Sequence, residues 1–159
     1  LVNAVLSRYP IIADSNPRLP GSIFRVPRRA LRTRIRLTET GSELIMISTH
    51  FSLNKEDRSN AAAWLNSRLS QALGPVLIGG DLNARPKSAV LKEFSPAWLV
   101  AEPEGPGLTW PASDPRARVD YLLARPREQL AMEKARTLRL PGSDHRMVIA
   151  EARLLGAGE

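Results

Sequence analysis

The chain contains no cysteine among its 159 residues. That absence excludes a disulfide scaffold and a zinc site built on thiolates. It suits a reducing cytoplasm but also allows a secreted bacterial protein, so the localisation stays open. Long apolar runs are missing too, because none approaches the roughly 20 residues that span a bilayer. What remains is an ordinary globular composition, 43% hydrophobic and 25% charged, long enough for one domain with a substantial core.

Acidic residues are fewer than basic ones, 16 against 23, and the net charge is +7. Lysine is scarce, since only Lys55, Lys87, Lys92 and Lys134 accompany the many arginines. Genomic base composition explains the preference for arginine, because alanine, leucine and proline are plentiful as well. It does not explain the positive net charge, which favours anionic partners by long-range attraction. Guanidinium groups bind phosphate through paired hydrogen bonds, so a phosphate-rich partner is indicated.

Hydrophobic periodicity predicts more strands than helices. Apolar residues alternating with arginines over 29–37 indicate a half-buried strand, which a turn at 38–41 joins to a deeper strand at 42–51. A helix is expected over 55–74, with Asn54 as its N-cap and Gly74 at its end. A loop is expected at 14–22, a short helix at 88–94, and further strands at 3–12, 75–81, 118–125, 133–140 and 146–154. This arrangement predicts an α/β (α+β) fold in which helices cover sheets.

Polar side chains stand at the ends of several predicted strands. They are Ser48-Thr49-His50, Asp81-Leu82-Asn83, Thr109-Trp110, Asp120 and Ser143-Asp144-His145. Each stretch taken alone has a plain structural explanation, as a turn former, a surface carboxylate or a hydrogen-bonded histidine. Together they offer oxygen ligands without thiols, both histidines of the chain, and surplus positive charge nearby. This combination indicates a site for a hard cation and a phosphate.

Hydrolysis of a phosphoester requires residues of these types. The reaction needs an oriented water, a clamp for the phosphoryl oxygens and help for the leaving oxygen. Asp81 can hold or deprotonate the water, and Asn83 can position it and donate to a phosphate oxygen. Asp120 is the natural partner to orient His145, because a neighbouring carboxylate raises the pKa of an imidazole and keeps it charged.

Six stretches form a specific signal when they occur in this order: "NAVLSRYPI", "STHF", "IGGDLNARP", "LTW", "RVDYLL" and "GSDHRMV". They cover nearly the whole chain. By these motifs the sequence resembles the endonuclease/exonuclease/phosphatase superfamily, which includes deoxyribonucleases, apurinic endonucleases, sphingomyelinases, inositol-polyphosphate phosphatases and deadenylases. The resemblance implies a four-layer α/β sandwich of two mixed β-sheets flanked by helices, with the site at one end of the sheets.

The resemblance also implies roles for particular residues. Asp81 and Asn83 handle the nucleophilic water and the phosphate, and Asp120 is the partner of His145, which stabilises the pentacovalent phosphate. His50 corresponds to a phosphate-contacting or acid-catalytic histidine of the deoxyribonuclease and sphingomyelinase branches. These five residues are the predicted catalytic set of a metal-dependent hydrolase, in which an Asp-activated water attacks phosphorus in line.

A magnesium or manganese ion is the implied cofactor, held by Asp144 and Asp81. Substrate contacts are expected from Asn83, Arg85 and Trp110, although Arg85 also fits a solvated loop and Trp110 also fits packing near the site. The implied partner is a phosphate-containing substrate, either a nucleic acid or a phospholipid or small phosphoester. The residues do not decide between these substrates.

The sequence departs from the family at its start. The family domain begins with a strand–helix–strand block that contributes an asparagine and a metal-anchoring glutamate, and this chain opens at "LVNAVLSRYP", just after that block. We therefore expect residues 1–155 to form one N-terminally incomplete domain, with a frayed tail at 156–159. Poor magnesium occupancy is expected without the glutamate. Such a domain is expected either to be marginally stable or to dimerise through the apolar face that the missing block would cover.

Two alternatives stay open. A catalytically impaired fragment or binding module of the same fold would bind phosphate-containing ligands without hydrolysing them. The missing glutamate favours this reading, and the retained set of Asp, Asn and His residues opposes it. Separately, the arginine-rich run at 25–36 can follow a polyanionic backbone or form a solvated strand face, and we favour the solvated face.

Overall fold

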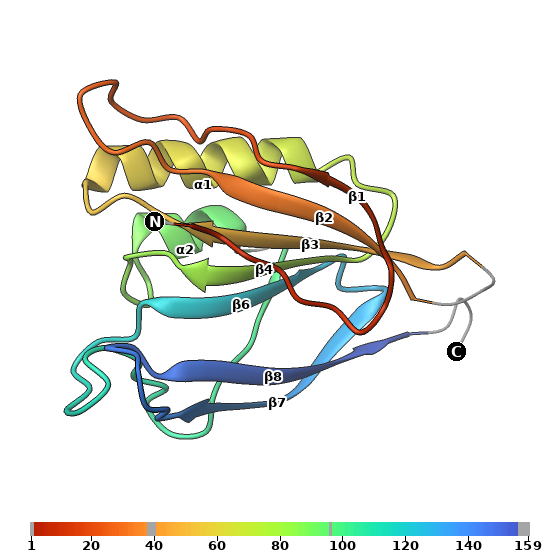
Figure 1. Cartoon of the computed structure of the whole chain (residues 1–159). Coiled ribbons are helices and arrows are strands. Elements are labelled where there is room, and N and C mark those ends of the chain that lie inside the picture. The colour runs from red at the N-terminus through yellow and green to blue at the C-terminus, as the bar shows by residue number, and fades with distance from the viewer. Residues whose placement is uncertain (1, 38–40, 96, 156–159) are drawn as a thin grey trace.

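A computed structural model describes residues 2–37, 41–95 and 97–155 and contains a large and a small β-sheet (Figure 1). The large sheet has six strands in the order β1-β2-β3-β4-β6-β5. β3 and β4 are parallel and the other neighbouring pairs are antiparallel, so this sheet is mixed. Its strands are β1 (Ile11–Ser15), β2 (Ala30–Arg36), β3 (Glu43–His50), β4 (Val76–Asp81), β5 (Leu99–Val100) and β6 (Asp120–Arg125).

The small sheet is an antiparallel pair of β7 (Leu130–Leu138) and β8 (Met147–Leu154). It contacts the large sheet at β5 and β6, next to which it lies in Figure 1. The predicted α/β fold with two sheets is confirmed, although only the large sheet is mixed within the described ranges. No helix in this part of the chain is long and apolar enough to cross a membrane.

Two helices, α1 (Lys55–Leu69) and α2 (Ala89–Phe94), pack on one face of the large sheet. α1 forms the crossover that the parallel pair β3 and β4 requires. Asn54 caps α1 as predicted, because its side-chain oxygen accepts hydrogen bonds from the backbone N–H groups of Glu56 and Asp57, at 3.0 and 3.1 Å. The core between helices and sheet includes Ile47, Leu65, Ile78, Phe94, Trp98 and Leu123, each 2% exposed or less.

The arginine-rich hairpin forms as its alternation predicts. β2 pairs with β3 along its whole length, from Ala30 to Arg36. Thr33 and Ile35 are buried, whereas Arg34 and Arg36 are exposed, as expected when successive side chains point to opposite faces. β3 lies between β2 and β4, which confirms the deeper position predicted for the second strand. Residues 38–40 of the predicted turn lie outside the described residues.

The predicted strand at 3–12 is wrong over most of its length. The strand begins at Ile11 and extends to Ser15, into the stretch that was predicted to be a loop. Residues 3–10 are not in a strand, and Leu6 is 97% exposed. Pro10, which has no N–H to donate, immediately precedes β1. An apolar run is therefore a poor predictor here, because β1 is an exposed edge strand and its pattern follows pairing with β2 rather than burial.

The predicted end of the long helix is also wrong. α1 stops at Leu69, where the backbone N–H of Ser70 closes the last turn on the carbonyl of Asn66. Leu73, the last member of the apolar stripe that Ala62, Leu65 and Leu69 begin in the sequence, is 98% exposed. Gly74 therefore lies in the following loop. The strand β5 has only two residues, which is too short for a periodic pattern to predict it. The tail predicted at 156–159 lies outside the described residues.

Candidate active site at one end of the large sheet

Three of the predicted residues occupy one row across adjacent strands. His50 is the register partner of Asp81, and Asp81 is the register partner of Asp120. Residues directly opposite one another in a sheet project from the same face, so the three side chains emerge together. β3 and β4 end at this row and the antiparallel β6 begins there. His50 Nε2 lies 3.3 Å from Asp81 Oδ2.

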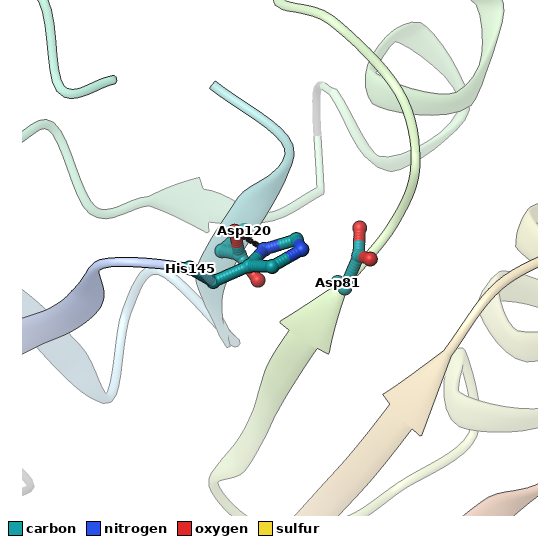
Figure 2. Close-up of side chains that lie close together, drawn as sticks. All are labelled: Asp81, Asp120 and His145. Atoms are coloured by element: carbon teal, nitrogen blue, oxygen red, sulfur yellow. Dashed lines mark hydrogen bonds and ion pairs between the residues drawn. The ribbon is translucent and has the colours of Figure 1, made fainter. Parts of the chain in front are cut away.

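His145 joins this row from the loop before β8. Its Nδ1 atom is 2.8 Å from Asp120 Oδ2, and its ring extends from Asp120 towards Asp81 (Figure 2). Asp120 and His145 are 25 positions apart in the sequence, and the fold brings them into contact. Because Nδ1 is held by a carboxylate, Nε2 is the ring nitrogen left for a ligand. The four side chains of His50, Asp81, Asp120 and His145 are called the end cluster below.

Thr109 fastens the His145 loop to β6, and sequence reasoning missed this role. Thr109 is fully buried, and its hydroxyl accepts hydrogen bonds from the backbone N–H groups of Val119 (3.1 Å) and Asp120 (3.3 Å). Its carbonyl accepts from the N–H of Arg146 at 2.7 Å. One buried residue thus positions both halves of the Asp120–His145 pair. The signal available in the sequence was a threonine beside Trp110 in the "LTW" stretch.

The two glycines before Asp81 differ in what a side chain would contact at their positions. Gly80 has φ +154°, and a Cβ atom there would lie 1.8 Å from the carbonyl oxygen of Thr49. Such a contact is impossible, so β3 can lie this close to β4 only beside a glycine. At Gly79 a Cβ would instead meet the side-chain ends of Leu122 and Met46 at 3.0 and 3.2 Å. Gly80 is therefore the residue that the backbone geometry requires.

Asn83 lies next to the end cluster and is held by the backbone. Its N–H donates to Asp81 Oδ1 at 2.7 Å, and its φ of +49° turns the chain sharply after β4. Its side-chain Nδ2 donates to the carbonyl of Phe51 at 3.0 Å. Within the described ranges one N–H of that amide is committed to structure, and the other N–H and the amide oxygen remain for a ligand.

Burial and charge shift the pKa values of the cluster in different directions. Burial alone would lower the pKa of His145, but the hydrogen bond to Asp120 and the charges of Asp120, Asp81 and Asp144 outweigh it and raise the pKa. Burial lowers the pKa of His50, against the opposing charge of Asp81. Burial raises the pKa of Asp81, although the Asn83 N–H opposes this shift. The cluster therefore favours one charged and one neutral imidazole.

A divalent cation has a possible binding place within the cluster. Ligand atoms of Asp81, Asp120 and His145 all lie within 4.8 Å of one another. The donor set suits a hard cation only in part, because both carboxylates already contact histidines and His145 Nδ1 is engaged with Asp120. Asp144, the predicted ligand beside His145, has an exposed side chain and is not in this group of three. Weak metal occupancy therefore stays our prediction.

Two of the three predicted substrate contacts, Trp110 and Arg85, have exposed side chains. Trp110 is 45% exposed in the loop that also carries Thr109. Arg85 is exposed, and its Nη1 donates a 3.4 Å hydrogen bond to the carbonyl of Arg116. The structure thus brings together His50, Asp81, Asp120 and His145 with Asn83 beside them. Arg85, Trp110 and Asp144 are exposed and have no hydrogen bond or ion pair to this cluster within the described ranges.

Comparison with known proteins identifies the family and the fold of the chain. The sequence model described as the Endonuclease/Exonuclease/phosphatase family matches residues 3–145. No curated protein matches the chain. The human Nocturnin catalytic domain with bound sulfate has the same fold, with a TM-score of 0.74 and 22% identity over 93% of this chain and 61% of its own.

Two further solved structures are similar to the same extent. A mannosyl-6-phosphatase from Bacteroides thetaiotaomicron VPI-5482 has a TM-score of 0.77 and 15% identity, over 91% of this chain and 67% of its own. TDP2 from D. rerio, complexed with a single-strand DNA product, has a TM-score of 0.74 and 15% identity, over 92% of this chain and 69% of its own. At such identities the likeness shows the fold. The chain spans about two thirds of the length of these structures.

Proposed function

Because the chain belongs to the endonuclease/exonuclease/phosphatase family, we propose that it hydrolyses phosphoester bonds at the end cluster of the large sheet. Members of this family are hydrolases that act on phosphoesters. The observation that carries the proposal is the Asp120–His145 pair at 2.8 Å, directed towards Asp81 on the neighbouring strand. A base, a cationic hydrogen-bond donor and a carboxylate that orients the donor are what attack of water on phosphorus requires.

In this mechanism Asp81 orients the attacking water and takes its proton. Burial raises the pKa of Asp81, which makes it a stronger base than a free carboxylate while it stays ionised above that pKa. Water then attacks phosphorus in line with the leaving oxygen. The second N–H of the Asn83 amide donates to a phosphoryl oxygen. His50, beside Asp81, assists from the neighbouring strand.

His145 stabilises the charge that develops on the phosphoryl oxygens. Its raised pKa keeps the ring protonated, so Nε2 can donate while Nδ1 is held by Asp120. A magnesium or manganese ion, held by Asp81 together with Asp120 or Asp144, would add positive charge at the same oxygens. The substrate is proposed only as a phosphate-containing compound, since the similar structures include a sugar phosphatase and a protein bound to a DNA product.

The test is hydrolysis of bis(p-nitrophenyl) phosphate by the full chain with added magnesium. Asp81→Ala removes the base, and we expect kcat to fall about a thousandfold. Asp14→Ala is the matched control, because Asp14 lies exposed on the edge strand β1 and should leave kcat unchanged. Retention of activity in Asp81→Ala would overturn the role of Asp81. Binding of phosphate by the wild type without any turnover would favour a non-catalytic binding module instead.

A further inference from the structure

A groove of about 360 Å³ opens beside the end cluster. Its lining includes Asn3, Asn16, Arg28 and Arg29, and it shares His50 with the cluster. A molecule bound at the cluster can therefore extend past His50 into this space. The groove comes from the chain between β1 and β2 and from the N-terminal segment, neither of which contributes a predicted catalytic residue. It is called the Arg28 groove below.

The walls of the Arg28 groove are held by hydrogen bonds. Asn3 Nδ2 donates to the carbonyl of Arg29 at 2.8 Å, and Arg29 Nη1 donates to the carbonyl of Asn16 at 2.7 Å. The carbonyl of Arg28 accepts from the N–H of Leu19, also at 2.8 Å. Three separate stretches are thereby tied around the base of Arg28. The backbone that carries Arg28 is fixed before any ligand binds, which limits the entropy that binding would cost.

The Arg28 side chain differs from its neighbours in having a buried nitrogen with nothing to bond. Its Nη1 has no hydrogen-bond partner within the described ranges. By contrast, Arg25 reaches Asp57 at 3.1 Å, Arg29 reaches Asn16, and Arg34 reaches Glu43 at 3.0 Å. A buried donor without a partner is unfavourable, and a buried cationic donor more so. An anion in the groove would satisfy it.

Arg28 also acts on the cluster electrostatically. Its charge is among the causes that lower the pKa of His50, after burial and the opposing effect of Asp81. Arg28 and His50 also line the same groove, so one substrate can reach both residues.

We propose that Arg28 binds a second phosphate of the substrate, the one that flanks the phosphate under attack. This inference rests on the proposed function and narrows it: the preferred substrate is a strand of nucleic acid or a fragment of one, rather than a compound with a single phosphate. Arg28 is then a specificity residue. It contacts the substrate outside the reacting atoms. Of the other arginines in the 25–36 run, Arg25, Arg29 and Arg34 have partners and Arg36 is exposed.

The test compares two ligands that differ by one phosphate, thymidine 5′-monophosphate and thymidine 3′,5′-bisphosphate. Isothermal titration with the full chain should give an affinity about tenfold higher for the bisphosphate, the effect of one charge-assisted hydrogen bond. Arg28→Ala should remove this difference, and Arg28→Lys should restore part of it. Arg36→Ala is the matched control, because it removes the same charge from the exposed far end of β2 and should keep the difference.

Three results would overturn the inference. The first is equal affinity of the wild type for the two ligands, which includes binding of neither. The second is an affinity difference between the ligands that persists in Arg28→Ala. The third is an affinity difference that Arg36→Ala removes as completely as Arg28→Ala does. Thermal unfolding of each variant shows whether it is folded. If Arg28→Ala does not fold, Arg28→Lys still tests the inference. Hydrolysis of bis(p-nitrophenyl) phosphate, which carries one phosphate, tests the proposed function separately. The two proposals can thus fail independently.

Discussion

The two faces of the large sheet come from the same strands but differ in what they bury. On the helix face, Ile47 and Ile78 are 2% exposed or less beneath α1 and α2. On the opposite face, Met46, Leu77 and Leu122 are only half-buried. This second face carries the row of His50, Asp81 and Asp120 at its end. The helix face carries the main core cluster, whereas the other face is buried less evenly and presents polar groups at its end.

The difference arises because successive residues of a strand point to opposite faces. In β4, Val76 and Ile78 point to the helices, whereas Leu77, Gly79 and Asp81 point away. A polar cluster can therefore form at the end of a strand without disturbing the core on its other side. The dimer predicted through an apolar face stays a prediction, and this half-buried face is where it would form.

The largest expected difference between the faces concerns two adjacent residues of β4. Ile78→Ala opens a cavity in the helix-covered core and should lower the free energy of unfolding by about 4 kcal/mol. Leu77→Ala removes a half-buried side chain of similar size and should cost about 1 kcal/mol. Urea denaturation followed by circular dichroism measures both values. Equal losses of unfolding free energy would show that the face opposite the helices is as well packed as the helix face.

The two glycines of β4 provide a second comparison. Gly80→Ala places a Cβ against the backbone of Thr49, which cannot yield as a side chain can, and should cost about 3 kcal/mol. Gly79→Ala meets the flexible ends of Leu122 and Met46 and should change stability by less than about 1 kcal/mol. The same denaturation experiment compares the variants. A stable Gly80→Ala protein would contradict the close approach of β3 and β4.

The smallest expected effect is a pH shift within the end cluster. Asp120→Asn removes the main partner that raises the pKa of His145, so that pKa should fall. The other charged or titratable groups around His145 are Asp81, Asp144 and His50. Because the protonated ring is the proposed donor, activity should be lost at a lower pH on the alkaline side than in the wild type.

The measurement is an NMR titration of the His145 ring without added metal, together with a pH–rate profile. Asp144→Asn is the matched control, since Asp144 is exposed and its charge is the least of the raising causes. It should shift the pKa of His145 less than Asp120→Asn does. A pKa unchanged in Asp120→Asn would show that the 2.8 Å contact does not control the protonation of His145.

Much of the fold could be predicted because its elements have strong local patterns. The hairpin of β2 and β3 follows from period-two alternation, and the start of α1 from Asn54 as a cap. The errors fall where local pattern is a weak guide: α1 ends at Leu69 although the apolar stripe continues to Leu73, and β1 is an exposed edge strand. Edge pairing and helix ends depend on neighbours that the local sequence does not specify.

The sequence by itself determined which residue types were available for chemistry and that they stand at strand ends. It could not determine that His50, Asp81 and Asp120 form one row, because strand register is set by pairing between distant segments. Nor could it separate Arg28, whose buried Nη1 has no partner among the described residues, from the paired Arg34 of the same run. Only the tertiary structure decides such matters, since burial and partners belong to the packed chain and not to the residue.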